Sequence, residues 1–309
     1  MHRLQITKAG TLSGHQNPIF AIENAPDPAI VFTGGNDKGV VQWDLRTMAF
    51  ERILYPVQFS VYALHLIAHS TLLAIGARDG KIGVIDTQTQ QLVARLEHHQ
   101  RPVFAIKSFK NKPELVVSSE DGTVSIWNTD TYELLYHFKV STQTVRTIAI
   151  SNDERWVVFG TKEGEVKLYN AVDYTFVEEL PGHSRPVTSL CFSPDGRYLL
   201  TGGRDAQLHV LDIGGFALVK DFTPHLFTVY AITYHPTLPI FATASRDKSI
   251  KLWAAGDFRL LRTISFEKGF DSHFLSINDI VWNPYKNQLV SVSDDKRVMV
   301  WDVSWEPGV

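Results

Sequence analysis

The chain has 309 residues, of which 44% are hydrophobic, 11% aromatic and 20% charged, with a net charge of −3 at pH 7. No run of about 18 apolar residues is present, which excludes a membrane-spanning helix, and the opening segment "MHRLQITKAG" lacks the apolar core of a secretory signal. The single cysteine excludes an intramolecular disulfide and fits a reducing compartment. We therefore expect a cytoplasmic protein without membrane contact.

One phrase recurs along the chain, beginning with "LSGHQNPIFAI" at residue 12. It returns as "LEHHQRPVFAI" at 96, "LPGHSRPVTSL" at 180, "FTPHLFTVYAI" at 222 and "DSHFLSINDIV" at 271. The segments "LYPVQFSVYAL" at 54 and "FKVSTQTVRTI" at 138 carry the pattern without histidine. A fixed internal repeat determines the whole architecture, so these seven copies outweigh any estimate of domain number from length.

The second half of each copy begins with an acidic turn, and these turns give the period. The turn acids are Asp37, Asp79, Asp121, Glu163, Asp205, Asp247 and Asp295. Five of their six separations are 42 residues and the last is 48, which places a six-residue insertion within 265–272. From each histidine, or its replacement, to the acid the distance is always 22 residues. The repeats account for nearly all of the chain, so we expect a single domain over residues 1–309.

Within a copy, short β-rich runs alternate with turn residues. The third copy shows them in order as "PVFAIKSF", "ELVVSSE", "TVSIWN" and "ELLYHF", and helical spacing is absent throughout. Four strands in a unit of 42 residues, repeated around an axis, is typical of a β-propeller blade.

The dipeptides at the two ends of the copies carry a resemblance. Gly14-His15 is followed by Trp43-Asp44, Gly182-His183 by Leu211-Asp212, and Trp301-Asp302 closes the last copy. The sequence resembles the WD-repeat (Trp-Asp) β-propeller family over essentially its whole length. The resemblance implies an all-β, seven-bladed propeller of four-stranded antiparallel blades. It also implies that the segment from Leu4 to Leu12 completes the C-terminal blade and closes the ring.

The same resemblance implies hydrogen-bonded structural tetrads of histidine, Ser/Thr, aspartate and tryptophan. The complete sets are His15, Thr33, Asp37, Trp43; His225, Thr243, Asp247, Trp253; and His273, Ser291, Asp295, Trp301. In the second copy the corresponding positions are Val57, Ile75 and Ile85, so polar partners are replaced together. We interpret the recurring His and Asp as structural. A metal site or catalytic pair would not need seven copies, and we expect no metal, cofactor or catalytic residue.

Two sets of variable positions are expected on the face where the histidine loops and acidic turns meet. The first follows the apolar residue that opens strand one: Phe20, Tyr62, Phe104, Arg146, Thr188, Tyr230 and Asn278. The second precedes each turn acid: Asn36, Arg78, Glu120, Lys162, Arg204, Arg246 and Asp294. In related propellers the first set lines the mouth of the central channel.

The composition of these sets predicts a partner-binding mouth, because aromatics and arginine are enriched at binding hot spots. The alternative is that the aromatics pack only on one another. The insertion adds Phe266 and Phe270 near the rim. One of them, which we expect to be Phe270, serves as the packing residue three before His273, and Phe266 stays free for a partner.

The function expected from these features is that of a non-enzymatic scaffold or adaptor. No phosphate-binding loop, dinucleotide fingerprint, nucleophile elbow or zinc spacing occurs. We expect a peptide or loop with an acidic or phosphorylated side chain beside an apolar one to bind at the mouth. A phosphorylated or nucleic-acid ligand is the second hypothesis, against which a pI near 6.5 argues. An enzymatic propeller ranks third, and we expect a monomer within a larger assembly.

Overall fold

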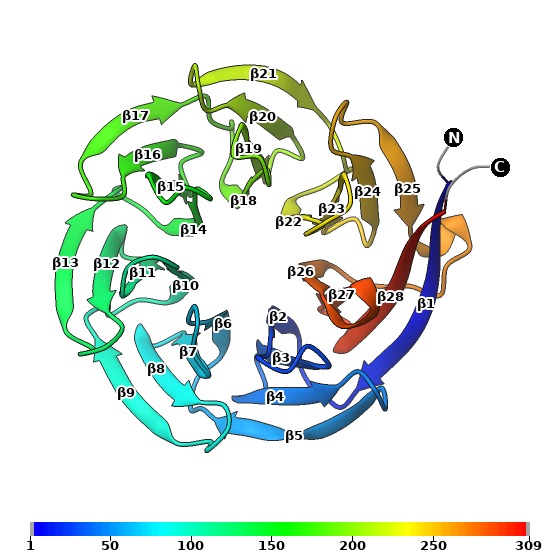
Figure 1. The fold of residues 1–309 in the computed structure, drawn as a ribbon, viewed down its shortest axis with the longest axis horizontal. Coiled ribbons are helices and arrows are strands. Elements are labelled where there is room, and N and C mark those ends of the chain that lie inside the picture. The colour runs from blue at the N-terminus through cyan, green and yellow to red at the C-terminus, as the bar shows by residue number, and fades with distance from the viewer. Residues whose placement is uncertain (1–2, 307–309) are drawn as a thin grey trace.

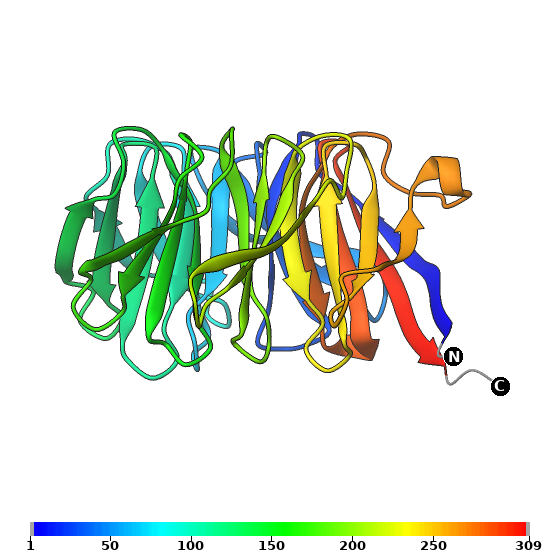
Figure 2. The ribbon, with the colours of Figure 1, turned by 90° about the horizontal axis from the view of Figure 1, so that it is seen from above.

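The computed structural model describes residues 3–306, which form seven four-stranded antiparallel sheets. The sheets stand as blades around a central channel (Figure 1). From the side the blades stand next to one another, and their connecting loops form two opposite faces (Figure 2). The predicted seven-bladed β-propeller is therefore confirmed. The described helices are the short 3-10 turns η1 (Phe266–Lys268) and η2 (Tyr285–Asn287), and neither could cross a membrane.

The first four blades use consecutive strands, ordered from the channel outward. Blade 1 contains β2 (Ile19–Asn24), β3 (Ile30–Gly35), β4 (Gly39–Asp44) and β5 (Ala49–Pro56). Blade 2 contains β6 (Val61–Leu66), β7 (Leu72–Ala77), β8 (Lys81–Asp86) and β9 (Leu92–Glu97). Blade 3 contains β10 (Val103–Ser108), β11 (Glu114–Ser119), β12 (Thr123–Asn128) and β13 (Leu134–Lys139). Blade 4 contains β14 (Val145–Ile150), β15 (Trp156–Thr161), β16 (Val166–Asn170) and β17 (Phe176–Leu180).

Blades 5 to 7 complete the ring. Blade 5 contains β18 (Val187–Phe192), β19 (Tyr198–Gly203), β20 (Leu208–Asp212) and β21 (Ala217–Phe222). Blade 6 contains β22 (Val229–Tyr234), β23 (Ile240–Ser245), β24 (Ile250–Ala254) and β25 (Leu260–Ile264). Blade 7 contains β26 (Ile277–Asn283), β27 (Gln288–Ser293), β28 (Arg297–Glu306) and, as its outer strand, β1 (Arg3–Ser13).

The pairing of β1 with β28 closes the ring, as predicted. Leu4 lies opposite Trp305 and Leu12 lies opposite Val298, with a bulge between Lys8 and Gly10. Leu12 is only 1% exposed, so the strand is anchored by its side chains as well as by its backbone. The predicted domain limits at residues 1 and 309 lie outside the described residues.

At several of the interfaces between neighbouring blades, a valine fits over a glycine. Val61 of blade 2 is fully buried, and a Cβ added to Gly34 of blade 1 would lie 2.6 Å from its Cγ1. Val103 over Gly76 and Val187 over Gly160 repeat this 2.6 Å approach. Only a residue without a side chain permits such closeness. These valine–glycine sockets bring the inner strands together and fix the width of the channel.

The acidic turns share one backbone conformation. The residue after each turn acid has a positive φ in all seven blades: Lys38, Gly80, Gly122, Gly164, Ala206, Lys248 and Lys296. Glycine adopts this left-handed region without steric cost, and Gly122 also needs the space, because a Cβ there would lie 2.4 Å from the carbonyl oxygen of Ser141. The turn therefore packs directly against the loop that leads into the next blade, as Gly80 does against His99 and Gly164 against His183.

Deleting residues 1–10 should lower the melting temperature by several degrees and promote association, because β28 would become an open sheet edge. The melting temperature and light scattering of the shortened and full chains would be compared. Lys8→Ala is the matched control within the same strand. It removes only the surface ion pair with Asp271, so its stability should change little. Equal melting temperatures for the shortened and full chains would contradict the closure.

Candidate functional site

The three predicted tetrads are hydrogen bonded and hold the loops of the upper face in Figure 2. In blade 6 the Trp253 Nε1–H donates to Thr243 Oγ1 at 2.9 Å, and the same oxygen lies 2.7 Å from His225 Nε2. His225 Nδ1 lies 3.0 Å from Asp247 Oδ2. Blades 1 and 7 repeat these contacts with Thr33 and Ser291 as the central hydroxyls.

The direction of these bonds defines the charge of the histidine. The tryptophan donates to the hydroxyl, the hydroxyl donates to Nε2, and Nδ1–H donates to the carboxylate, so each proton has one acceptor. This chain requires a neutral imidazole. In agreement, burial lowers the pKa of His15 and of His225. Hydrogen bonds from Asn17, His15 and the Gln16 amide outweigh burial at Asp37 and lower the pKa of that carboxyl.

Blade 3 contains a fourth tetrad that the sequence analysis did not identify. His99 binds Asp121 at 2.9 Å and Ser125 at 2.9 Å, and Trp127 donates to Ser125 at 2.8 Å. The hydroxyl comes from the third strand, because the second strand carries Val117 at the paired position. The predicted tetrads take their hydroxyl from the second strand of the blade. In the structure, a hydroxyl at the paired position of the third strand serves equally well.

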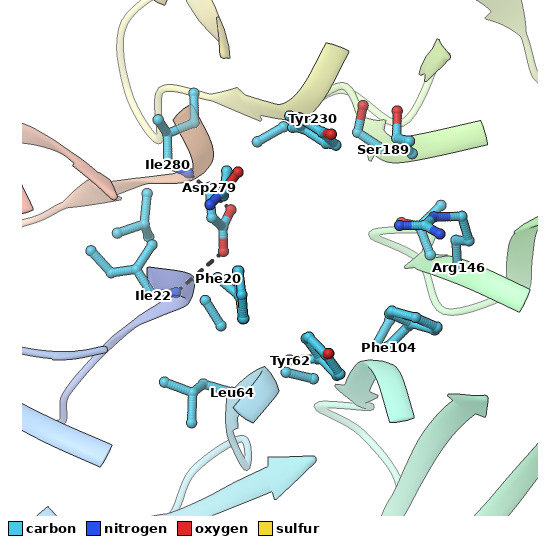
Figure 3. A pocket seen from close by; sticks show the side chains of 18 of the residues that line it. Phe20, Ile22, Tyr62, Leu64, Phe104, Arg146, Ser189, Tyr230, Asp279 and Ile280 are labelled. Carbon is cyan, nitrogen blue, oxygen red and sulfur yellow. Dashed lines mark hydrogen bonds between the residues drawn. The ribbon is translucent and has the colours of Figure 1, made fainter. Parts of the chain in front are cut away.

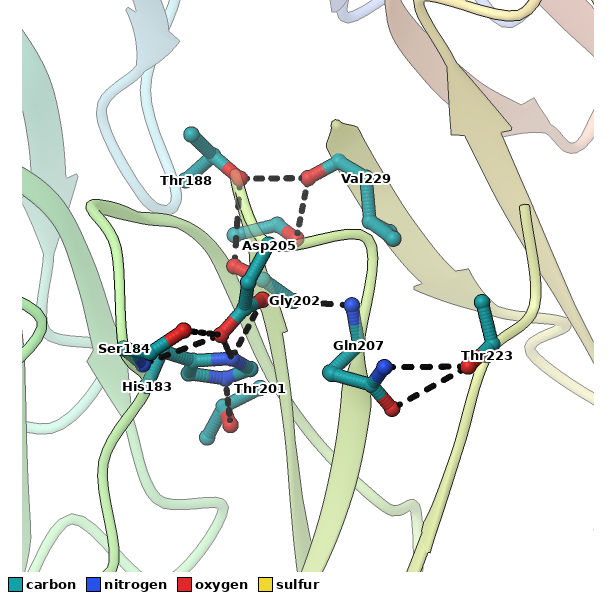
Figure 4. A network of polar contacts seen from close by, with 10 residues as sticks. His183, Ser184, Thr188, Thr201, Gly202, Asp205, Gln207, Thr223 and Val229 are labelled. Atoms are coloured by element: carbon teal, nitrogen blue, oxygen red, sulfur yellow. Dashed lines mark hydrogen bonds and ion pairs between the residues drawn. The ribbon is translucent and has the colours of Figure 1, made fainter. Parts of the chain in front are cut away.

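Two other blades keep part of the network. In blade 5, His183 bridges Asp205 and Thr201, and the Asp205 carboxylate also binds the loop at Ser184 (Figure 4). His209 stacks on His183 with ring centroids 4.1 Å apart. Blade 4 has lost histidine but not the outer contact, because Ser141 and Thr142 donate to Glu163. In that blade Phe159 and Tyr169 replace the inner tetrad partners, whereas the outer hydroxyl–carboxylate contact is kept.

A β-bulge at the same point of every first strand forms the mouth of the channel. The ladder between strands one and two skips one residue in each blade: Phe20, Tyr62, Phe104, Arg146, Thr188, Tyr230 and Asn278. These are the seven positions of the first predicted set, and all of them line a cavity of about 650 Å³. A bulge re-aims the extra side chain away from the sheet. Seven otherwise regular blades thereby present seven variable side chains to one opening.

Three aromatics and one arginine form a continuous arc along part of this opening. The rings of Phe20 and Tyr62 lie 5.3 Å apart, and those of Tyr62 and Phe104 lie 5.4 Å apart. The Arg146 guanidinium stacks 4.9 Å from the Phe104 ring centroid. All four residues remain half-exposed. The rings therefore pack on one another and also face the lumen (Figure 3). We call Phe20, Tyr62, Phe104 and Arg146 the aromatic arc.

Positive charge lies beside this arc, across blades 4 to 6. Exposed Lys162, Arg204 and Arg246 stand at the corresponding turn position of three successive blades. Burial and the neighbouring charge of Arg204 lower the pKa of Arg146. Within the described chain, no hydrogen-bond acceptor or carboxylate pairs with the Arg146 guanidinium. Arg78 lies apart from this basic group, in blade 2.

Two members of the first set already serve the contacts between blades. The Asn278 amide donates to the Ile19 carbonyl and to Asp294, each at 2.8 Å. Thr188 donates to the Val229 carbonyl of blade 6 at 2.5 Å (Figure 4). These side chains join neighbouring blades, and their polar atoms are therefore less available to a partner than those of Arg146.

An acid inside the channel escaped the sequence analysis. Asp279 follows the bulged Asn278 and lies at a position where other blades have Ala, Thr or Ser. Its carboxylate accepts the backbone N–H groups of Ile22 at 3.3 Å and Ile280 at 2.9 Å (Figure 3). Although the side chain touches the lumen, protein surrounds it, and this burial raises the pKa of Asp279 to about 7.

Apolar loop tips on blades 6 and 7 also went unnoticed. The two residues after the histidine are Leu226 and Phe227 in blade 6 and Phe274 and Leu275 in blade 7, with exposed fractions of 82%, 54%, 52% and 41%. The other five blades have at least one polar residue there. Arg246 lies 5.9 Å from the Phe227 ring centroid. This side of the upper face therefore carries an exposed apolar patch next to the basic residues.

The insertion places its two aromatics differently. Phe270 packs against the Trp301 edge at 6.2 Å, whereas Phe266 is 78% exposed in η1. The insertion lies at the outer edge of the ring (Figures 1 and 2). Phe266 is consequently not brought together with the mouth. Over residues 3–306, no three His, Cys, Asp or Glu side chains gather in a way that could hold a metal ion.

Replacing Thr243 with valine should destabilise the protein by about 3 kcal/mol, because Trp253 Nε1–H and His225 Nε2 would both lose their partner in a buried site. Chemical denaturation would measure the loss. Thr243→Ser is the matched control, since blade 7 uses Ser291 in this role, and it should cost about 1 kcal/mol or less. Equal stability of the valine and serine variants would show that the hydroxyl bond is unimportant.

Replacing Asp279 with alanine should stabilise the protein at pH 8, because the buried carboxylate is costly there. With a folded pKa of about 7 against 3.8 unfolded, the penalty grows from pH 4 to pH 7 and is constant above. Channel water reduces it to on the order of 2 kcal/mol. Alanine stands at this position in blades 1, 2, 3 and 6. Unfolding free energies at pH 5 and 8 would test this, and a difference independent of pH would contradict it.

A sequence profile of the WD domain, G-beta repeat, matches six segments of the chain: 6–44, 90–128, 132–170, 174–212, 216–254 and 264–302. No curated protein was found to be similar to the chain. The unmatched stretch, 45–89, contains the inner strands of blade 2, where Ile75 and Ile85 replace the tetrad partners, yet it folds as a blade like the others. With matches over most of its length and seven four-stranded blades, the chain belongs to the WD40 repeat family.

Proposed function

We propose that this propeller binds a segment of another protein across the channel mouth, with an acidic or phosphorylated side chain on the basic residues and an apolar side chain on the aromatic arc. WD40 propellers generally serve as scaffolds for protein interactions and are typically non-enzymatic. The single observation that carries the proposal is the position of Arg146. It ends the aromatic arc, lies next to the basic residues and has no hydrogen-bond acceptor among residues 3–306.

Separate physical arguments support binding of the apolar side chain by the aromatic arc and binding of the acidic side chain by the basic residues. Ring faces that are half-buried in advance offer contact area with little further loss of side-chain entropy. A guanidinium that is stacked and unpaired is oriented to bind two oxygens of a carboxylate or phosphate. Lys162 stands in the same blade as Arg146 and Arg204 in the next one, so their charges add to the field at Arg146.

A phosphate-dominated ligand, including a nucleic acid, is the second candidate, supported by the same basic residues. Against an extended polyanion, the channel contains Asp279 and Glu23, and Glu120 and Asp294 stand between the cations on the turns. A complex held mainly by phosphates weakens steeply with salt, whereas one anchored on the aromatic arc weakens less.

Arg204→Glu and Phe104→Ser should each reduce the capture of specific partners from a native cell extract by roughly tenfold or more, as expected for hot-spot residues. The captured proteins would be quantified by mass spectrometry at low and moderate salt. Circular dichroism would establish that each variant is folded.

Arg197→Glu is the matched control. It makes the same charge change in the same blade, but on the loop before β19, at the opposite face from Arg204. Its only ion pair, with Asp212 at 3.5 Å, is exposed and contributes little. If all three variants capture the same proteins as the wild type, the mouth is not the recognition site.

A further inference from the structure

The channel wall contains a second, oppositely charged feature, which the proposed function does not use. Asp279 projects into the lumen just below the rim, and Figure 3 shows it between Phe20 and Tyr230, with Arg146 on the far side of the channel. Phe20 belongs to β2 and Tyr230 to β22, the inner strands on either side of β26. The carboxylate thus lies between two aromatic rings at the entrance of a cavity of about 650 Å³.

The fold itself does not need this acid. Ala21, Ala63, Ala105 and Ala231 occupy the same place in four other blades, and their bulges are identical in register. The carboxylate receives two backbone N–H groups but no side-chain cation, because no lysine, arginine or histidine lies within ion-pair distance of it among residues 3–306. An uncompensated carboxylate inside protein is costly, and a cation from outside would offset this cost.

The other charges of the wall leave Asp279 unbalanced. Glu23 of β2 and Lys107 of β10 act on it with opposite signs, since Lys107 lowers and Glu23 raises its pKa. Glu23 is itself engaged by His65 at 3.4 Å. The position that follows Asp279 or its equivalent is aliphatic and buried in every first strand, and all seven residues line the cavity: Ile22, Leu64, Ile106, Ile148, Leu190, Ile232 and Ile280.

We propose that Asp279, flanked by Phe20 and Tyr230, forms a binding site for a single organic cation, an alkylammonium or guanidinium group that enters the channel from the mouth. The carboxylate supplies the countercharge, the ring faces supply cation–π attraction, and the aliphatic wall accommodates the attached hydrocarbon. This site rests on the proposed function in one respect, namely that ligands reach the channel from the mouth. The cation comes either from a side chain of the bound protein segment or from a free small amine.

Butylammonium is the probe, because it carries this chemistry without a partner protein. A ¹H–¹⁵N titration at pH 8 should show saturable shifts of the Ile22 and Ile280 amides, which donate to Asp279. Butyrate should produce no such shifts. Asp279→Asn should weaken binding at least tenfold. Asp279→Ala, which imitates the other blades, provides a second variant whose folding is not in question.

Thr147→Ala is the matched control, since Thr147 holds the same position in blade 4. It should bind butylammonium as the wild type does. Binding should also weaken about tenfold from pH 8 to pH 6, because a carboxyl with a pKa of about 7 is only about one tenth ionised at pH 6. Protonation of Glu23 or His65 would affect the wild type and Asp279→Asn equally. The difference between their pH dependences therefore isolates the contribution of Asp279.

The two sources are separated by capturing partners from extract with Asp279→Asn. Loss of both butylammonium and protein partners assigns the cation to a partner side chain. Loss of butylammonium alone assigns it to a free amine. The absence of saturable binding to the wild type, or equal binding to Asp279→Asn, overturns the cation site. Neither result depends on whether Arg204→Glu loses partners, so the site and the proposed function can fail separately.

Discussion

Closure of the ring is the constraint on which the rest of the structure depends. Each sheet has two apolar faces, and both are covered only when a blade stands on each side. The β1–β28 pairing completes blade 7 with strands from the two ends of the described chain, such as Leu4 opposite Trp305. The inner-strand residues that begin each blade, such as Ile19, Val61 and Ile277, are at most 1% exposed as a result. The channel and its mouth exist because this closure holds the first strands at one radius.

The repeat made the fold predictable, because seven copies with a period of 42 residues give the number of blades and the β-rich runs within a copy give four strands, while the family resemblance implied the closure. It also identified the mouth positions, although not the reason for them. The reason is a bulge in the ladder of every first strand, such as the one at Phe20. Bulges depend on backbone pairing, for which a single sequence gives no direct sign, so the sequence showed that these positions vary and the strand register showed why they face the channel.

What the sequence did not reveal depends on contacts between strands. Ser125 replaces a hydroxyl of the neighbouring strand because the two positions face one another across the ladder. Asp279 was not predicted, because the variable set contains the bulged residue Asn278 and not the residue after it, although both line the channel. The apolar tips at Leu226 and Phe274 were missed because the loops were compared only at their histidines. In each case the informative comparison was between equivalent positions of different blades.

The valine–glycine sockets have a thermodynamic consequence for whatever enters the channel. Because a Cβ at Gly34 or Gly76 would overlap the next blade, these blades are already in close contact with their neighbours. The lumen is therefore a receptor whose wall is closely packed at these interfaces before any ligand arrives. Such a receptor pays little conformational entropy on binding, and it discriminates by size and charge rather than by closing around its ligand. Selectivity must then reside in the few side chains that differ between blades.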